Sequence, residues 1–287
     1  MRNRHGFTLV ELVVALVLFG LVGTSIYSLL VNNQRLYLSQ SERVNANTSA
    51  RAAVSILPHS IRELSATDLD GSDILAATAT GFRFRSLKNV YFACQDGALG
   101  TLVLDRATWF GIRALDVTTD SLLIFAENDL ATRTDDQWLH ANVTSAVVGT
   151  ACPSSQPSIT LLLDLLSGTM SGVLQGAPVR SYQIEQVSAY SDASGDSWLG
   201  AQTISKSTGT AGTIQPIVGP LSGAGLALVY YDANGDVTAD RARIARMGIT
   251  VVGQSRSVVR TDTGIGYLTQ DLTTDVSLRN NCRFSCP

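Results

Sequence analysis

The chain has 287 residues, of which 45% are hydrophobic and 16% charged, a balance that predicts a folded core and excludes intrinsic disorder. Its formal net charge of −3 gives no electrostatic footprint for nucleic acid, so we expect none among the partners. Arg241, Arg243 and Arg246 cluster along the sequence, but charged residues at this spacing more often form a solvated face of a folded domain.

The amino terminus has a short basic segment, residues 1–6, followed by a long apolar run, residues 7–31, in which Glu11 is the only side chain charged at neutral pH. As a helix, about 25 residues extend over roughly 37 Å and can cross a bilayer. The arginines Arg2 and Arg4 keep the basic segment in the cytoplasm and direct the rest of the chain outward. An ionised carboxylate at the centre of a bilayer costs about 2.5–3.5 kcal/mol, so Glu11 calls for a cationic partner.

Residues 6–12, Gly-Phe-Thr-Leu-Val-Glu-Leu, resemble the class III signal of type IV prepilins and type II secretion pseudopilins. The resemblance implies that prepilin peptidase cleaves between Gly6 and Phe7 and methylates the new amino terminus on Phe7. It also implies that Glu11 pairs with the terminal amine of a neighbouring subunit. In this family the subunit thought to cap the tip lacks the glutamate, so we expect a chain with Glu11 to lie beneath the tip.

Two other interpretations of the amino terminus compete with this one. The first is an ordinary signal anchor that carries a glutamate by chance. The second is a cleaved secretory signal, which fits poorly because the apolar stretch is too long and no small-residue cleavage site follows it.

The helical pattern continues past the membrane segment over residues 32–65. Residues 32–57 contain neither Gly nor Pro. Pro58 is expected to kink or end the helix because it lacks an N–H and clashes with the preceding turn, although residues 60–64 can add one turn. This segment resembles the second half of the long N-terminal helix of larger minor pilins, and we expect its polar half to pack against the head domain.

Beyond residue 65 the pattern changes to short strands separated by Gly, Asp and Ser. No strand–helix–strand alternation appears, so we predict an α+β fold in which the long N-terminal hydrophobic helix, the pilin spine, packs on an antiparallel β-sheet head over residues 66–287. Residues 192–213 are rich in Ser, Gly, Thr and Asp and are expected to form a surface loop. The predicted strands are 82–87, 90–94, 99–104, 122–126, 158–163, 182–188, 226–231, 247–252 and 271–278.

The segment 219–252 resembles the late part of PilW-type minor pilins, with a strand, an Asn-Gly turn and a returning strand. Asn234 and Gly235 lie between apolar runs, which is a strong hairpin signal. Calcium binding is a weaker alternative, because Asp232, Asn234 and Asp236 alternate as the first ligands of a calcium loop do. The closing position of such a loop would be Arg243 rather than a bidentate glutamate, so the hairpin is favoured.

Four cysteines, Cys94, Cys152, Cys282 and Cys286, are an even number, which favours disulfides in an exported domain. Four cysteines allow three pairings. Cys282 and Cys286 are close enough in sequence to close a tight loop, and Cys94 would then pair with Cys152. A zinc site would need histidines at ligand spacing from the cysteines, and the sequence has none.

No catalytic constellation rises above background, since the histidines are isolated and neither a Gly-x-Ser-x-Gly motif nor a phosphate-binding loop is present. We therefore expect no enzyme activity, no cofactor and no metal. The prediction is a minor pilin, a structural and assembly-priming subunit of a type IV pilus. The alternatives are a minor pseudopilin of type II secretion and a pilus-associated adhesin or DNA-uptake subunit.

This interpretation predicts where the chain resides and what it contacts. The expected partners are major and minor pilins, prepilin peptidase, the inner-membrane assembly platform and the lipid bilayer. We expect a single-pass protein of the inner membrane with a periplasmic head, which then enters a pilus or pseudopilus.

Overall fold

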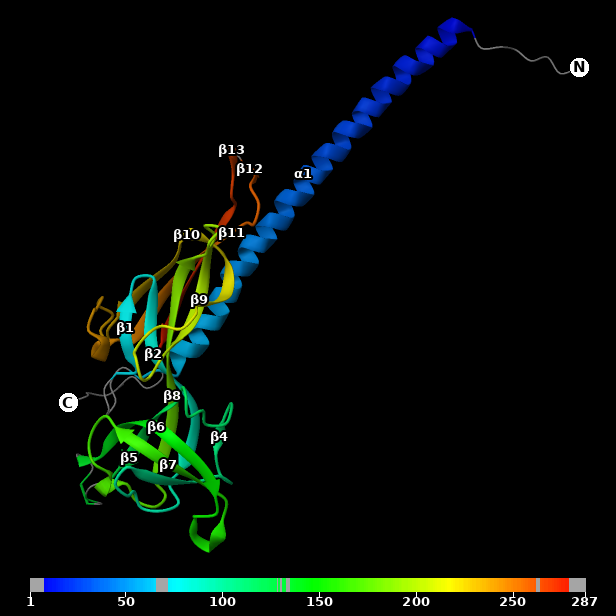
Figure 1. Ribbon diagram of the computed structural model, residues 1–287. Helices are drawn as coiled ribbons and strands as arrows, with labels where there is room; N and C mark the ends of the chain where they lie inside the picture. Colours follow the sequence, from blue (N-terminus) through cyan, green and yellow to red (C-terminus); the bar gives the residue numbers. More distant parts are fainter. Residues whose placement is uncertain are drawn as a thin grey trace, which may run out of the picture.

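The computed structural model describes residues 8–65, 72–127, 129, 131–132, 135–261 and 264–278. One long helix, α1 (Leu9–Arg62), extends from a head built around a large antiparallel sheet (Figure 1). The predicted α+β fold is confirmed. The other elements are β1 (Ile74–Thr78), β2 (Gly81–Phe92), β3 (Thr101–Asp105), β4 (Phe110–Gly111), β5 (Ser121–Ala126), β6 (Gln137–Gly149), η2 (Pro153–Ser155), β7 (Ser158–Leu165), η3 (Met170–Gly172), β8 (Pro178–Ser191), β9 (Ser197–Ile204), β10 (Gln215–Tyr231), η4 (Arg241–Arg243), β11 (Arg246–Gln254), β12 (Val259–Thr261), β13 (Gly264–Gly266) and β14 (Thr269–Ser277).

The two halves of α1 have different surroundings. No residue from Leu9 to Asn45 is buried, whereas the second half packs on β10, β11 and β14. The buried positions recur every three or four residues, which is the period of one helix face, and most of them are small. They are Ala46, Ser49, Ala50, Ala53, Leu57 and Ile61.

Strand β11 approaches the backbone of α1 closely at Gly253. A Cβ atom at this position would lie 2.1 Å from the carbonyl oxygen of Ala46 and 3.0 Å from the backbone nitrogen of Ala50. Nearby, the Ser49 hydroxyl donates to the carbonyl of Gly219 at 3.1 Å. Small side chains on both surfaces therefore allow the sheet to lie directly on the helix backbone.

The head has two lobes that share one sheet (Figure 1). Strands β2 and β8 pair from Gly81↔Ser188 to Phe92↔Pro178 and run through both lobes. The proximal lobe lies against α1 and contains β1, β9, β10, β11 and β14. The distal lobe contains β3 to β7, which lie in the chain between the end of β2 and the start of β8. The lobe therefore takes the place of a turn between these two antiparallel strands.

Each lobe has its own hydrophobic core. In the proximal core, helix residues such as Leu57 and Ile61 pack with strand residues such as Ile249, and the rings of Phe82 and Phe84 stack at 5.0 Å between centroids. The distal core contains no residue of α1 and is closed by strand residues and the η3 segment. Its largest buried members include Tyr91, Leu102, Leu104, Leu122, Ile124 and Leu139.

Several sequence predictions need correction. The prediction of a loop over residues 192–213 is wrong for Ser197–Ile204, which form strand β9 and pair with both β8 and β10. Gly200 in β9 is a packing position rather than a turn residue, since a Cβ would lie 2.6 Å from the Tyr190 ring. Pro58 lies inside α1, and the helix continues to Arg62 by the extra turn that the sequence allowed.

Two further differences concern strand boundaries. The predicted strands 82–87 and 90–94 form one strand, β2, with an irregularity in its register between Leu87 and Asn89. Strand β6 was not predicted, although Leu139, Ala141 and Val143 alternate with more exposed residues as in a half-buried strand.

Candidate functional site

The start of α1 is stabilised by a reciprocal capping box between Thr8 and Glu11. The backbone N–H of Glu11 donates to the Thr8 hydroxyl at 3.2 Å, and the backbone N–H of Thr8 donates to Oε2 of Glu11 at 3.2 Å. This arrangement satisfies two backbone donors that a helix start leaves without partners. Glu11 therefore has a local role at the helix start.

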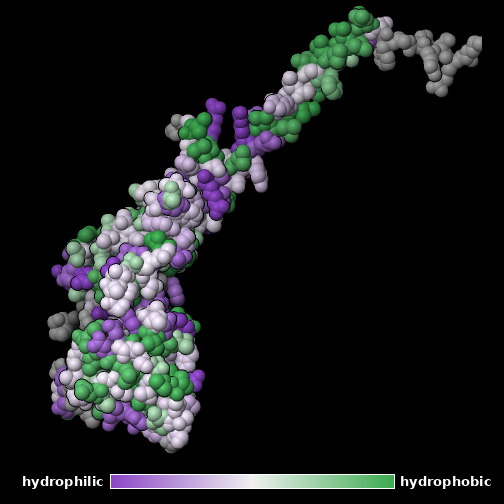
Figure 2. Space-filling model, in the orientation of Figure 1, coloured by the Kyte–Doolittle hydropathy of each residue, from purple (hydrophilic) through white to green (hydrophobic). Residues whose placement is uncertain are grey.

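The first half of α1 presents apolar side chains to its surroundings on all sides. Figure 2 shows this part as a mostly hydrophobic rod, interrupted by a paler band, that projects away from the head. Leu9, Phe19 and Leu29 are among its exposed residues, with 81%, 80% and 64% of their surfaces accessible. The helix is long and apolar enough to cross a membrane, and the head leaves its apolar window uncovered. Such a surface requires lipid or partner helices.

The hydroxyl groups within this apolar segment bond to the helix itself. Thr24 donates to the carbonyl oxygens of Gly20 and Leu21 at 3.0 and 2.9 Å, and Ser25 donates to that of Leu21 at 2.9 Å. Hydroxyls satisfied in this way carry little cost in hydrocarbon. The helix continues through this region, including Ser28.

Two glycines leave part of this helix surface open. A Cβ atom at Gly20 or Gly23 would have no neighbour within 4 Å apart from the helix itself. Small residues permit close approach of another helix in a membrane. The surface therefore suits packing against further helices as well as lipid.

A family model described as the prokaryotic N-terminal methylation motif matches residues 1–27. The chain carries a type IV pilin-like prepilin signal. This signal implies pilin-type assembly partners, and together with the apolar N-terminal helix it fits anchoring in a membrane. No curated protein matches the chain. No solved structure matches it either.

Among the residues predicted for processing and assembly, the structure places Glu11, while Gly6 and Phe7 lie outside the described residues. The capping role of Thr8 was not predicted from the sequence. The signal for it was present, because Thr followed three residues later by Glu, just before an apolar run, is the sequence pattern of a capping box.

Cys94 and Cys152 form the first of the two expected disulfides, with Cα atoms 5.5 Å apart. The bond joins the end of β2 to the segment that follows β6, so it lies wholly in the distal lobe. Cys282 and Cys286 lie outside the described residues.

The strands β10 and β11 pair antiparallel as predicted, but the Asn-Gly turn does not connect them directly. Asn234 and Gly235 form the tight turn. Gly235 has a φ of 92°, a backbone conformation that glycine adopts more readily than residues with a side chain. The turn closes only the bridge Tyr231↔Val237, after which the chain passes through η4 before β11 begins.

The weak calcium candidates lie in this turn, where Asp232 serves the turn itself. Its Oδ1 accepts the backbone N–H groups of Asn234 and Asp236 at 2.9 and 3.0 Å. Its Oδ2 accepts from the Arg243 guanidinium at 2.7 Å. Within the described part of the chain, no group of three or more His, Cys, Asp or Glu side chains is placed to hold a metal ion.

The three clustered arginines are engaged within the proximal lobe. Arg243 pairs with Asp232, and Arg241 donates to the carbonyl of Leu75. Arg246 lies over the ring of Tyr231 at 4.4 Å and within 3.5 Å of Asp275. Arg241 and Arg243 remain exposed, in agreement with the solvated face expected from the sequence.

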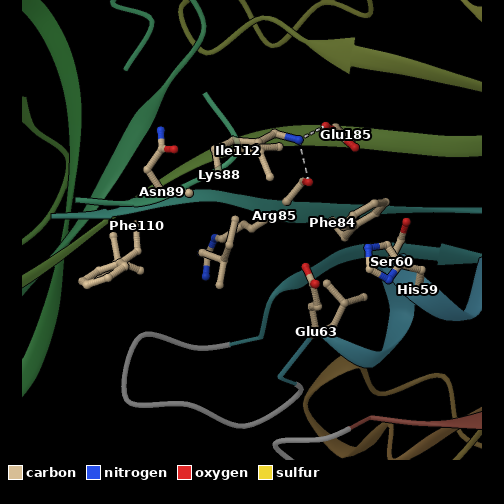
Figure 3. A pocket seen from close by; sticks show the side chains of 15 residues that line it. His59, Ser60, Glu63, Phe84, Arg85, Lys88, Asn89, Phe110, Ile112 and Glu185 are labelled. Atoms are coloured by element: carbon tan, nitrogen blue, oxygen red, sulfur yellow. Dashed lines mark hydrogen bonds and ion pairs between the residues drawn. The ribbon is translucent and has the colours of Figure 1, made fainter. Parts of the chain in front are cut away.

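A cleft of about 500 Å³ lies where the end of α1 meets the junction of the two lobes. In Figure 3, His59 of the helix and Glu63, its C-cap residue, face Arg85 of β2 across this cleft, which Phe110 and Ile112 also line. The Lys88 ammonium pairs with Glu185 at 2.5 Å and also donates to Ser86 at 2.8 Å. Charges of both signs line the cleft, so it has no strong preference for an ion of one sign.

Lys206, in the loop between β9 and β10, makes a polar contact that joins the two lobes. Its ammonium donates to the backbone carbonyls of Val117, Asp120 and Val143 at 2.5, 2.9 and 2.8 Å. Burial lowers the pKa of Lys206, and the nearby carboxylates of Asp120 and Asp116 oppose that shift. All three acceptors belong to the distal lobe, so Lys206 links it to the proximal lobe.

Proposed function

We propose that the chain is a minor pilin, a structural and assembly-priming subunit of a type IV pilus rather than an enzyme. The observation that carries this proposal is the first part of α1, which carries the prepilin signal and whose apolar side chains the head leaves exposed. A subunit with this surface is completed by the helices of other subunits once it leaves the bilayer. The proposal includes cleavage between Gly6 and Phe7 and methylation of Phe7.

The same amino terminus serves pseudopilins of type II secretion. Three features favour the pilus: the length of the chain, the late Asn-Gly turn and the preceding Gly-Pro-Leu segment, all of which resemble PilW-type minor pilins. The engaged arginines of the proximal lobe further favour a scaffold over a DNA-uptake component.

We further propose that the charge of Glu11 sets the register between subunits. Cleavage creates a cationic amine at Phe7, and only one axial offset between neighbouring helices brings that amine to Glu11. Two unit charges at ~4 Å attract by about 4 kcal/mol at an effective dielectric of 20, before the cost of desolvation. Since helices in lipid associate through weak packing forces, a pair of this strength can decide their register.

The capping box permits a test that separates the charge of Glu11 from its local role. Glu11→Gln keeps an oxygen that can accept the Thr8 N–H but removes the charge, whereas Thr8→Ala removes the hydroxyl of the cap and keeps the charge. We expect Glu11→Gln and Glu11→Ala to reduce co-purification with other prepilins and incorporation into sheared pili by tenfold or more, on the order of 1.4 kcal/mol. Thr8→Ala should be close to the unmodified protein.

Cleavage must be monitored in each variant, by N-terminal sequencing that should begin at methylated Phe7. Normal incorporation of Glu11→Gln together with loss in Thr8→Ala would assign Glu11 to helix capping alone. Recovery of the chain with secretion components instead of sheared pili would favour the pseudopilin alternative.

A further inference from the structure

The hairpin formed by β12 and β13 projects from the head along α1, toward the membrane-spanning end of the helix (Figure 1). Its base is fixed by two sets of bonds. Ser255, which is fully buried, exchanges hydrogen bonds with Leu268, and Oε2 of Glu42 accepts the backbone N–H groups of Arg256 and Ser257 at 2.8 and 3.3 Å. The hairpin is therefore held at a defined height on the helix.

A groove of about 690 Å³ separates this hairpin from helix residues 32–39. The charged side chains that line it are Arg35 of the helix and Arg260 of the hairpin, and both are exposed. No ion-pair partner for either arginine occurs among the described residues. The only acidic residue in the sequence 256–267 is Asp262, which lies outside the described residues.

The hairpin also exposes apolar side chains beside these cations. Ile265 is 82% exposed, and Val258 and Tyr267 are about half exposed. Figure 2 shows hydrophilic side chains gathered where the apolar part of the helix ends and the head begins. Arginine, tyrosine and aliphatic side chains in this combination are typical of surfaces that lie at the interface of a bilayer.

The position along the helix fits the same interface. The hydrocarbon core is about 30 Å thick and is spanned by about 20 helical residues, so a core that begins near Leu9 ends near residue 28. Headgroups of about 5–7 Å then reach roughly residue 33. Residues 32–39 and the hairpin beside them lie at and just above this level, where long arginine side chains reach lipid phosphates.

We propose that this hairpin surface, Arg35, Val258, Arg260, Ile265 and Tyr267, docks on the anionic headgroups of the bilayer that holds α1. The contact adds a second attachment to the membrane and fixes the tilt of the head before assembly. The proposal depends on the membrane insertion of α1, and it assigns to the hairpin a partner that the prepilin signal does not specify.

The test uses the full chain in vesicles of phosphatidylethanolamine and phosphatidylglycerol, with photoreactive benzoylphenylalanine replacing one residue at a time. Replacement of Leu18, in the apolar part of α1, should give lipid adducts and reports insertion. Replacement of Ile265 should also give lipid adducts. Replacement of Val237, which is 72% exposed in the turn after β10, should give none.

Arg260→Gln should lower the lipid adduct yield at position 265 roughly fivefold, because one cationic side chain near an anionic leaflet changes partition by about that factor. Arg106→Gln, an exposed arginine of the distal lobe, is the matched control and should have no effect. The effect of Arg260→Gln should disappear in vesicles of phosphatidylcholine alone.

The outcomes separate this proposal from the function proposed above. Lipid adducts at Leu18 with none at Ile265 above the level of Val237 would overturn headgroup docking while α1 remains inserted. Adducts at Ile265 to a second copy of the chain or to another prepilin, in place of lipid, would also overturn it. Absence of adducts at Leu18 would contradict membrane insertion, and with it the basis of both proposals.

Discussion

The proximal and distal lobes share strands β2 and β8 but complete their cores in different ways. The proximal core includes Leu57 and Ile61 of α1, so the lobe is closed by the same helix that carries the prepilin signal. The distal core is closed by its own strands and the η3 segment, and the Cys94–Cys152 disulfide lies in the same lobe. The comparison indicates that the proximal lobe couples the head to the helix, whereas the distal lobe is an independently supported insertion.

This difference predicts which perturbations stay within one lobe. Damage to the disulfide should affect the distal lobe alone, and damage to the helix contact should affect the proximal lobe alone. Hydrogen exchange measured by mass spectrometry on the full chain in detergent resolves the two lobes, because unprotected amides report local opening.

Replacement of both bonded cysteines, Cys94→Ala with Cys152→Ala, should destabilise the distal lobe most strongly. The bond joins residues 58 apart in sequence, and the chain-entropy model for a loop of that length gives about 4 kcal/mol. Exchange should accelerate in β3, β5, β6 and β7 while β10 and β11 stay protected. Equal acceleration in β11 would show that the two cores unfold as one unit.

Gly253→Ala should loosen α1 from the proximal lobe. The added Cβ would lie 2.1 Å from the Ala46 carbonyl oxygen, and backbone on both sides must shift to accommodate it. We expect a loss of about 3 kcal/mol, at the upper end for overpacking, with faster exchange in the second half of α1 and in β11. Gly223→Ala, also in the proximal lobe, is the control, because a Cβ there has no neighbour within 4 Å. A Gly253→Ala protein as stable as this control would refute direct contact between sheet and helix backbone.

Lys206→Met tests the connection between the lobes. The substitution keeps an apolar stem but leaves the carbonyls of Val117, Asp120 and Val143 without the ammonium. We expect the free energy of unfolding to fall by about 2 kcal/mol. The fall is limited because the substitution also removes the cost of burying the ammonium, the same burial that lowers the pKa of Lys206. Exchange should increase at the start of β5 and in β6, with each lobe's core still protected. Unchanged exchange at these sites would mean that the shared strands alone hold the lobes together.

Tyr230→Phe should have the smallest effect. We expect it to lower the free energy of unfolding by about 1 kcal/mol at neutral pH, because the hydroxyl's hydrogen bonds are lost. The Tyr230 hydroxyl donates to the carbonyls of Thr78 and Gly81 at 2.8 and 3.1 Å, and burial raises its pKa above the ordinary value. An unfolded tyrosine ionises near pH 10, so this stabilisation is complete below about pH 10 and is lost as the pH rises further.

The pH dependence of the variant sharpens the comparison between the lobes. Denaturation at pH 9 and pH 11 should show that Tyr230→Phe loses less proximal-lobe stability over this range than the unmodified protein. Burial also raises the pKa of Tyr91 in the distal lobe, so the alkaline loss there should persist. Tyr267→Phe, a half-exposed tyrosine, is the control. Identical alkaline profiles for the Tyr230→Phe and unmodified proteins would exclude this account of Tyr230.

The sequence alone determined the features that depend on local composition and short-range pattern. The apolar run, Glu11 and the glycine–phenylalanine junction predicted the membrane helix and the prepilin signal, because hydrophobic length and local order carry that information without a fold. Nine predicted strands fell on eight observed ones, since period-two alternation marks a half-buried strand.

Only the tertiary structure decided the features that depend on which distant segments meet. The separate roles of β9 and of Gly253 could not be predicted, because Gly and Ser are typical of loops until a neighbouring ring or helix backbone fills the space beside them. The two cores, the Lys206 link and the hairpin beside helix residues 32–39 join segments far apart in sequence, and no local pattern records such pairings. The anchoring end of this protein therefore follows from local sequence, whereas the two-lobed head follows from long-range packing.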